Sequence, residues 1–272
     1  MRRYLRAELF RSAAIIAAMA LAAPAARANV FTNGDAEAGD FSGWTLGSGY
    51  WGSPAVGSAP ANLTAGGTLT PDKFLPGGQY DIGTSPPGVF TVTNAGTDAN
   101  TGGVLSTVYA GSHSFKLNDA NNNYSVSAMK QTVTNYSGTN VYFAWAAVLQ
   151  GSHGLTDSDN FSVLLIDETT STTLYTASYS SASAAGSNLF QQNGGTYFTN
   201  WQVENIDVSD SVGHTLALEV MAADCNLGGH WGYVYLDGFG EVVPPSDLPE
   251  PASMSLFGLG MAGLALLRRR KG

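Results

Sequence analysis

Hydrophobic and polar residues alternate with a period of two along much of the chain between residues 114 and 237. Successive side chains of a strand point to opposite faces of a sheet, so this period is typical of half-buried β-strands. The alternating runs are also rich in β-branched and aromatic residues, which favour strands. The predicted strands are Ser114–Asn118, Val126–Val133, Val141–Leu149, Phe161–Ile166, Thr172–Tyr179, Val203–Val208, His214–Met221 and Gly232–Asp237.

Clusters of Gly, Ser, Asn and Asp separate these runs and predict turns, for example at residues 119–123 and 192–195. No sustained helical period occurs outside the two ends of the sequence. Short strands with polar turns and no intervening helices indicate one all-β domain over residues 29–242, a single antiparallel β-sandwich of the jelly-roll type. The stretch from Gly47 to Gly103 is rich in Gly and Pro, and it predicts long loops with short strands such as Gly88–Thr93.

The first 28 residues have the pattern of a signal peptide. Arginines precede the apolar run Ala13–Ala23, and Ala26-Arg27-Ala28 is a small-x-small cleavage site. The alternative is an N-terminal membrane anchor, which usually needs roughly 17–25 apolar residues. The short run therefore predicts export and a mature chain that begins at Asn29.

The last 24 residues have the pattern of a sorting tail. A proline-containing spacer at residues 243–248 leads to Pro249-Glu250-Pro251, and the uncharged run Ala252–Leu267 follows. As a helix this run would be about 24 Å long, slightly short of a typical bilayer span. A basic cluster then predicts a stop to translocation on the cytoplasmic side. Its members are Arg268, Arg269, Arg270 and Lys271.

Residues 249–272 resemble the PEP-CTERM sorting signal of Gram-negative bacteria, and Pro249, Glu250 and Pro251 are the matching signature. The resemblance implies recognition by an exosortase-type membrane transpeptidase. The hydrophobic helix would hold the protein in the inner membrane until that enzyme removes the tail. The expected destination is the cell surface or the extracellular matrix.

The region between the two ends is strongly acidic. It contains 19 of the 21 Asp and Glu residues but only three of the 12 Lys and Arg residues, namely Lys73, Lys116 and Lys130. Such a charge repels phosphate backbones and argues against nucleic acid as a partner, whereas it favours cations such as Ca²⁺. Cys225 is the only cysteine, so no intramolecular disulfide is possible.

Two segments of the predicted domain resemble the galactose-binding-like jelly-roll modules, many of which bind carbohydrate. The first is Asn33–Trp44, with the order Asn-Gly-x-x-Glu-x-Gly before the tryptophan, and the second is Asp224–Phe239. Gln131 fits the Gln-x-Val strand that this family has between them. The first and last strands of a jelly roll are expected side by side, which would bring Glu37 close to Asp237.

The family often has one structural Ca²⁺ at that position, so the resemblance implies Glu37 and Asp237 as its side-chain ligands. Calcium prefers oxygen ligands of this kind. The alternative is that Glu37 caps a turn and Asp237 ends a strand without any metal.

Aromatic rings stack on the apolar faces of sugars and often dominate the energy of an interface. Tyr50 and Trp51 are candidates because they lie in a predicted glycine-rich loop, and Trp231 and His230 are candidates because they lie in the closing segment. The alternatives are a buried tryptophan and a structural histidine that bonds loop backbone.

The sequence contains neither a His-Glu-x-x-His motif nor a Gly-x-Ser-x-Gly elbow. We therefore expect an exported, non-catalytic surface or matrix protein that binds exopolysaccharide or another glycan. Two alternatives stay open. One is a secreted glycosidase-like hydrolase whose acids are among the core carboxylates, and the other is a purely structural matrix component.

Overall fold

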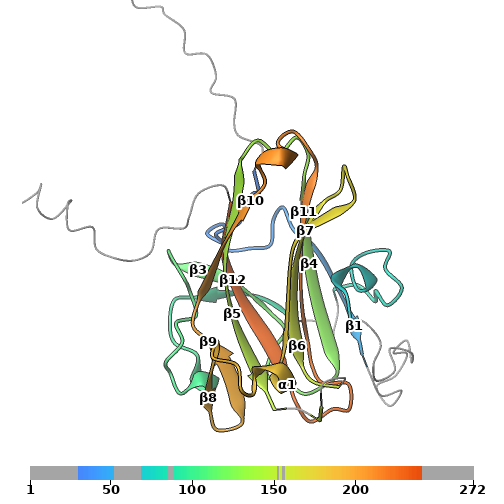
Figure 1. Ribbon diagram of the computed structural model, residues 1–272. Helices are drawn as coiled ribbons and strands as arrows, with labels where there is room; N and C mark the ends of the chain where they lie inside the picture. The colour runs from blue at the N-terminus through green and yellow to red at the C-terminus, as the bar shows by residue number, and fades with distance from the viewer. Residues whose placement is uncertain (1–29, 52–68, 85–88, 152, 155–156, 241–272) are drawn as a thin grey trace, which may run out of the picture.

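The computed structural model describes residues 30–51, 69–84, 89–151, 153–154 and 157–240. Two antiparallel sheets face each other in these residues and form a sandwich (Figure 1). The predicted class, an all-β antiparallel jelly-roll sandwich, is confirmed. The predicted signal peptide, the spacer and the sorting tail lie outside the described residues. No helix among the described residues is long and apolar enough to cross a membrane.

The first sheet, sheet A, has five strands in the order β1-β4-β11-β6-β7. Its elements are β1 (Thr45–Tyr50), β4 (Ser125–Val133), β6 (Asn160–Asp167), β7 (Thr172–Ser180) and β11 (Leu216–Ala223).

The second sheet, sheet B, has the order β2-β3-β12-β5-β9-β8, and β10 also pairs with β5. Its elements are β2 (Phe90–Asn94), β3 (His113–Leu117), β5 (Asn140–Gln150), β8 (Phe190–Asn193), β9 (Thr196–Thr199), β10 (Gln202–Asp207) and β12 (Gly232–Gly240). Short helical turns lie in the connections, namely η2 (Pro71–Lys73), η3 (Ala99–Thr101), α1 (Ser181–Ala184) and η4 (Ser209–Ser211).

The main core fills the space between the two sheets. Phe115, Phe143, Trp145 and Phe161 are fully or almost fully buried there, together with aliphatic side chains from the same inward-facing positions. The polar end of the Trp145 ring is satisfied because its Nε1 donates a hydrogen bond to Glu204 Oε1 at 2.9 Å. Period-two alternation therefore identified the eight strands β3, β4, β5, β6, β7, β10, β11 and β12, whereas β1 and the short strands β8 and β9 were not predicted.

The predicted loop region holds more structure than expected. β1 contains Gly47 and Gly49, so it lacks the β-branched pattern of a strand, yet it pairs with β4 over its whole length. The segment 69–80 covers the outer face of sheet A, where Phe74 and Tyr80 form a second small core with Trp51. A side-chain carbon on Gly47 would lie 2.2 Å from the carbonyl oxygen of Phe74. Glycine in β1 therefore allows the segment 69–80 to pack directly against the backbone of this strand.

The expected pairing of the first and last strands is wrong. β1 is an edge strand of sheet A, whereas β12 lies inside sheet B between β3 and β5. The segment before β1 approaches β12 instead, since Phe239 N donates a hydrogen bond to Gly34 O at 3.0 Å. This contact, and not strand pairing, brings the opening segment to the end of β12.

Candidate functional site

Both tryptophans among the predicted sugar-stacking aromatics are buried. Trp51 is only 5 % exposed because it packs in the cluster beneath the segment 69–80. Trp231 is 9 % exposed and stacks on Tyr233, with ring centroids 5.4 Å apart. Tyr50 is half-buried at the end of β1. The expectation that Tyr50 and Trp51 lie in an exposed loop is therefore wrong.

A polar pocket of about 550 Å³ lies on the outer face of sheet A. Thr45, Lys130 and Glu219 line it from the sheet, and Asp72, Lys73 and residues 75–79 line it from the covering segment. This volume is typical of pockets for small molecules. Sequence reasoning missed this pocket, because it forms only where the segment 69–80 folds back on the sheet.

The three sheet residues of the pocket are neighbours across three strands. Lys130 on β4 lies opposite Thr45 on β1 and opposite Glu219 on β11 in the sheet register. Directly opposite residues of antiparallel strands share one face, so the three side chains project together. The Lys130 ammonium lies 3.0 Å from Glu219 Oε1 and 2.7 Å from Glu168 Oε1.

The charges of this group are stabilised by one another. Glu219 is only 4 % exposed. Partial burial disfavours the charged form of Lys130, but the hydrogen bonds to Glu168 and Glu219 outweigh it and raise the pKa of the Lys130 ammonium. The pocket therefore has a fixed cationic donor beside carboxylate acceptors.

The covering segment is held in place by its own backbone. Pro71 begins the turn η2, Gly78 N donates a hydrogen bond to Leu75 O at 2.7 Å, and Tyr80 N donates one to Lys73 O at 2.8 Å. The buried rings of Phe74 and Tyr80 fix the same segment to the sheet. The pocket wall is thus a closed turn and not a free loop.

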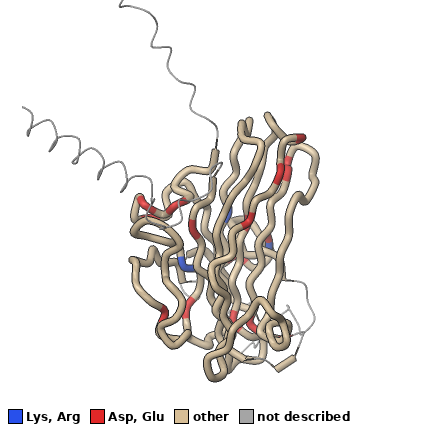
Figure 2. The backbone as a smooth tube through the Cα atoms, turned by 60° about the vertical axis from the view of Figure 1, so that its left-hand side comes forward, with Lys and Arg blue, Asp and Glu red and all other residues tan. Residues whose placement is uncertain are grey.

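The pocket gathers rare positive charge. Acidic residues are spread over the described chain and lysines are few (Figure 2). Lys73 and Lys130, two of the three lysines between the predicted signal peptide and tail, both line the pocket. The scarcity of lysine is visible in the sequence, and it is the signal that could have drawn attention to Lys73 and Lys130.

The two predicted calcium ligands, which are 200 residues apart in the sequence, contact the same loop. Glu37 Oε1 accepts hydrogen bonds from Ser112 N at 2.7 Å and from His113 N at 2.9 Å. Asp237 Oδ2 accepts hydrogen bonds from the backbone N–H groups of residues 109 and 110, both at 3.0 Å. The structure brings both side chains to one loop, and whether they share a metal stays a prediction.

The environment of Asp237 disfavours its charged form. Its side chain is almost fully buried, and burial raises its pKa to about 7, with the negative charge of Asp35 adding to the effect. Among the described residues, neither Glu37 nor Asp237 takes part in an ion pair. The last predicted site residue, His230, lies in the connection between β11 and β12, away from this loop.

Comparison with known proteins gives one family match. The model of the PEP-CTERM protein-sorting motif matches residues 247–271. No curated protein matches the chain.

Several solved structures resemble the chain at low identity. One is the carbohydrate-binding module TmCBM61, solved in complex with β-1,4-galactotriose. Its sequence is 11% identical, the alignment covers 78% of this chain and 95% of that chain, and the TM-score is 0.37. Another is CBM28, a carbohydrate-binding module specific for non-crystalline cellulose. Its sequence is 14% identical, the alignment covers 77% of this chain and 93% of that chain, and the TM-score is 0.37. The chain described here carries a PEP-CTERM protein-sorting motif that follows an antiparallel β-sandwich.

Proposed function

We propose that this is an exported, non-catalytic surface or matrix protein that binds a hydroxyl-rich exopolysaccharide in the polar pocket on sheet A. The sorting motif at residues 247–271 supports the destination. An exosortase-type transpeptidase is the partner that would process this tail. The observation that carries the binding proposal is the Lys130–Glu219 pair inside a pocket of about 550 Å³.

A sugar hydroxyl donates one hydrogen bond and accepts others. The Lys130 ammonium supplies donors, the Glu219 carboxylate supplies acceptors on the sheet side of the pocket, and the Asp72 carboxylate supplies acceptors on the covering segment. Hydrogen bonds to charged groups are stronger than neutral ones. A neutral, hydroxyl-rich polymer can use both kinds of partner at once, whereas a polyanion would meet the two carboxylates.

A calcium ion is proposed to support this fold at the loop between β2 and β3. Glu37 and Asp237 would offer carboxylate oxygens, which calcium prefers as ligands, and Asp35 lies near enough to Asp237 to act on it through its charge. The raised pKa of buried Asp237 is the observation that fits a cation, because a cation would offset the cost of its charge. Bound calcium would hold the opening segment and the end of β12 to one loop.

Titration calorimetry of the purified protein, with oligosaccharides selected on a glycan array, tests the binding proposal. Removing a charged hydrogen bond costs about 1.5–3 kcal/mol, which is at least roughly tenfold in affinity. We therefore expect Lys130→Ala and Glu219→Gln each to weaken binding by about tenfold or more. Thr132→Ala is the matched control, since Thr132 is an exposed residue of the same strand and does not line the pocket.

The proposal is wrong if no glycan binds, or if the two pocket variants bind as tightly as the control. An assay for new reducing ends in the same mixtures separates binding from cleavage. Cleavage of the bound glycan would favour the hydrolase alternative.

A further inference from the structure

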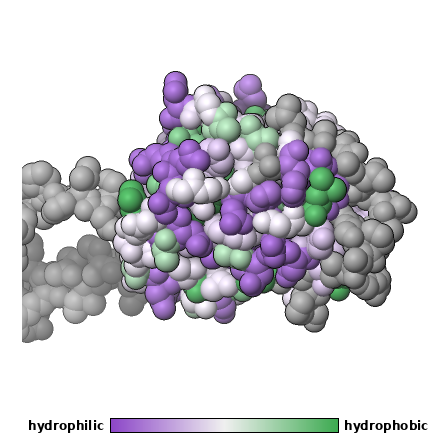
Figure 3. Space-filling model, turned by 90° about the horizontal axis from the view of Figure 1, so that it is seen from below, coloured by the Kyte–Doolittle hydropathy of each residue, from purple (hydrophilic) through white to green (hydrophobic). Residues whose placement is uncertain are grey.

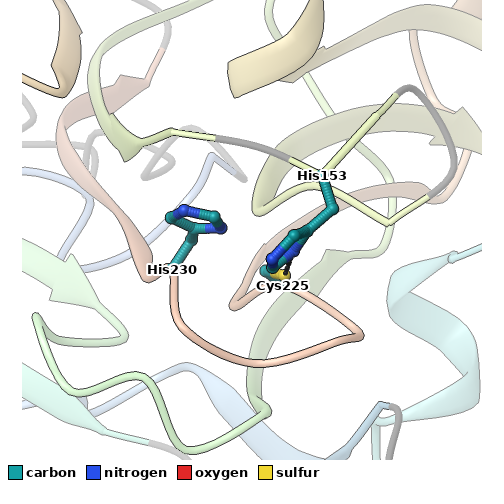
Figure 4. Close-up of side chains that lie close together, drawn as sticks. All are labelled: His153, Cys225 and His230. Atoms are coloured by element: carbon teal, nitrogen blue, oxygen red, sulfur yellow. Dashed lines mark hydrogen bonds between the residues drawn. The ribbon is translucent and has the colours of Figure 1, made fainter.

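Three side chains that can bind metals meet at one end of the sandwich. His153 lies in the connection between β5 and β6, and Cys225 and His230 lie in the connection between β11 and β12. Their ligand atoms are all within 4.8 Å of one another. His153 Nδ1 lies 3.0 Å from Cys225 Sγ, and the two imidazole centroids are 4.6 Å apart. Figure 4 shows both histidine rings directed toward the same space beside the sulfur.

The backbone holds Cys225 and His230 together. Cys225 N donates a hydrogen bond to His230 O, and Gly228 N donates one to Cys225 O, both at 3.1 Å. Gly228 and Gly229 have φ angles of 75° and 89°, a left-handed conformation that favours glycine. The segment Cys225–His230, with the order Cys-x-x-Gly-Gly-His, thus forms a tight turn that places His230 next to Cys225.

The β5–β6 connection, which carries His153, packs closely against this turn. Asn226 N donates a hydrogen bond to Asp157 O at 3.0 Å, which joins the two connections. Gly151 has a φ of 56°, and a side-chain carbon there would lie 2.9 Å from Cδ2 of His230. Glycine at position 151 therefore leaves room for the imidazole ring.

One ring atom of this group lacks a partner. His230 Nδ1 is buried and has no hydrogen-bond partner, although buried polar atoms are normally satisfied. An unpartnered imidazole nitrogen beside a thiol sulfur is suited to a metal ion.

The ligand types select the kind of cation. Thiolate and imidazole bind soft and borderline transition metals, whereas calcium and magnesium prefer oxygen. Tetrahedral zinc with bonds of about 2.0 Å to nitrogen and 2.3 Å to sulfur separates these ligand atoms by roughly 3.5 Å. The 3.0 Å between His153 Nδ1 and Cys225 Sγ and the 4.8 Å limit for the whole cluster lie on either side of this spacing.

We propose that His153, Cys225 and His230 bind one transition-metal ion of the zinc class. The ion would join the β5–β6 and β11–β12 connections, in a protein that has no disulfide to do so. Three protein ligands leave a fourth position for water or an external ligand. His153 is exposed, and the end of the sandwich seen in Figure 3 is mostly hydrophilic, so the ion can enter from solvent.

Cobalt(II) is the probe for this site because its thiolate complexes absorb light where the free ion does not. We expect the purified, reduced full-length protein to bind one equivalent of Co²⁺ with a thiolate charge-transfer band, and Zn²⁺ to displace it. Cys225→Ser should abolish the band. His153→Asn and His230→Asn should each weaken Zn²⁺ binding by at least tenfold, as measured by competition with a chromophoric chelator.

Cys225 is fully buried, so Cys225→Ser needs a circular dichroism check of folding. His153→Asn changes an exposed residue and keeps the test decisive if the cysteine variant unfolds. His214→Gln is the control, because His214 bonds Asp167 and lies outside the cluster. The proposal is overturned if the wild type binds no Zn²⁺ or Co²⁺, or if His153→Asn binds Zn²⁺ as tightly as His214→Gln. Binding of Ca²⁺ in place of Zn²⁺ at these residues would overturn it as well.

Discussion

Gln131 binds both backbone polar groups of Thr32. Its Oε1 accepts a hydrogen bond from Thr32 N at 2.6 Å, and its Nε2 donates one to Thr32 O at 2.9 Å. Gln131 is on β4 and is nearly buried. The Gln131 side chain thus holds the opening segment, which also carries Glu37, against sheet A. This contact is the physical role of the glutamine in the Gln-x-Val strand pattern.

We predict that Gln131→Glu lowers the free energy of unfolding by about 1–3 kcal/mol. The substitution replaces the Nε2 donor with an oxygen that faces the Thr32 carbonyl, and an unsatisfied buried polar group costs about this much. Urea denaturation followed by tryptophan fluorescence measures the change. Thr132→Ala on the same strand serves as a control, and an unchanged stability of Gln131→Glu would show that the contact is not needed.

A second prediction concerns pH and the buried acids Asp159 and Asp224. Burial raises the pKa of Asp159 to about 8, with the charge of Asp224 adding to it, and burial raises the pKa of Asp224 to about 7. An unfolded aspartate titrates near 3.9. The folded state therefore holds more protons between about pH 4 and pH 8, and the free energy of unfolding should fall as the pH rises through this window.

Urea denaturation at several pH values, in buffer that contains a chelator, measures how the free energy of unfolding changes with pH. Asp159→Asn keeps the shape of the side chain without its charge, so it should flatten the slope and be relatively more stable at high pH. Asp167 does not contribute to the slope in this pH window. Hydrogen bonds from His214 and Ser211 outweigh the effect of burial and lower its pKa to about 2. A stability that rises between pH 5 and pH 8 would contradict the prediction.

The third prediction is that Ca²⁺ raises the melting temperature of the protein. A ligand that binds only the folded state stabilises it by about 2.7 kcal/mol at a hundredfold excess over its dissociation constant. Asp237→Asn removes the buried charge and should abolish the response to Ca²⁺, while Asp210→Asn, in the turn after β10, should keep it. Differential scanning calorimetry with Ca²⁺ and with chelator gives the measurement. Equal melting temperatures in the two conditions would exclude the shared site.

The fourth prediction concerns the sorting motif. Replacing Pro249, Glu250 and Pro251 with alanine should leave the sandwich folded but block processing of the tail, since these residues lie in the matched motif at 247–271. Mass spectrometry of the protein from the producing cells distinguishes the full and the shortened C-terminus. Normal processing of the triple variant would show that these residues are not the recognised signature.

The sequence alone determined the class of the fold and the sorting motif. Period-two alternation is a local property of each strand, so runs such as Val126–Val133 and Val141–Leu149 predicted strands that the structure has as β4 and β5. The motif at residues 247–271 is likewise a contiguous run of residues. Both signals are short-range, and they could be read without any knowledge of the fold.

Only the tertiary structure decided which residues meet. β1 pairs with β4 and not with β12, which places Thr45 opposite Lys130, and the pairing of β11 with β4 places Glu219 opposite Lys130 from the other side. His153 reaches Cys225 across 72 residues, and Trp51 is buried because the segment 69–80 covers it. Contacts of this kind depend on strand order and on the path of connections, which many distant residues set together. The pattern within one segment carries no information about them.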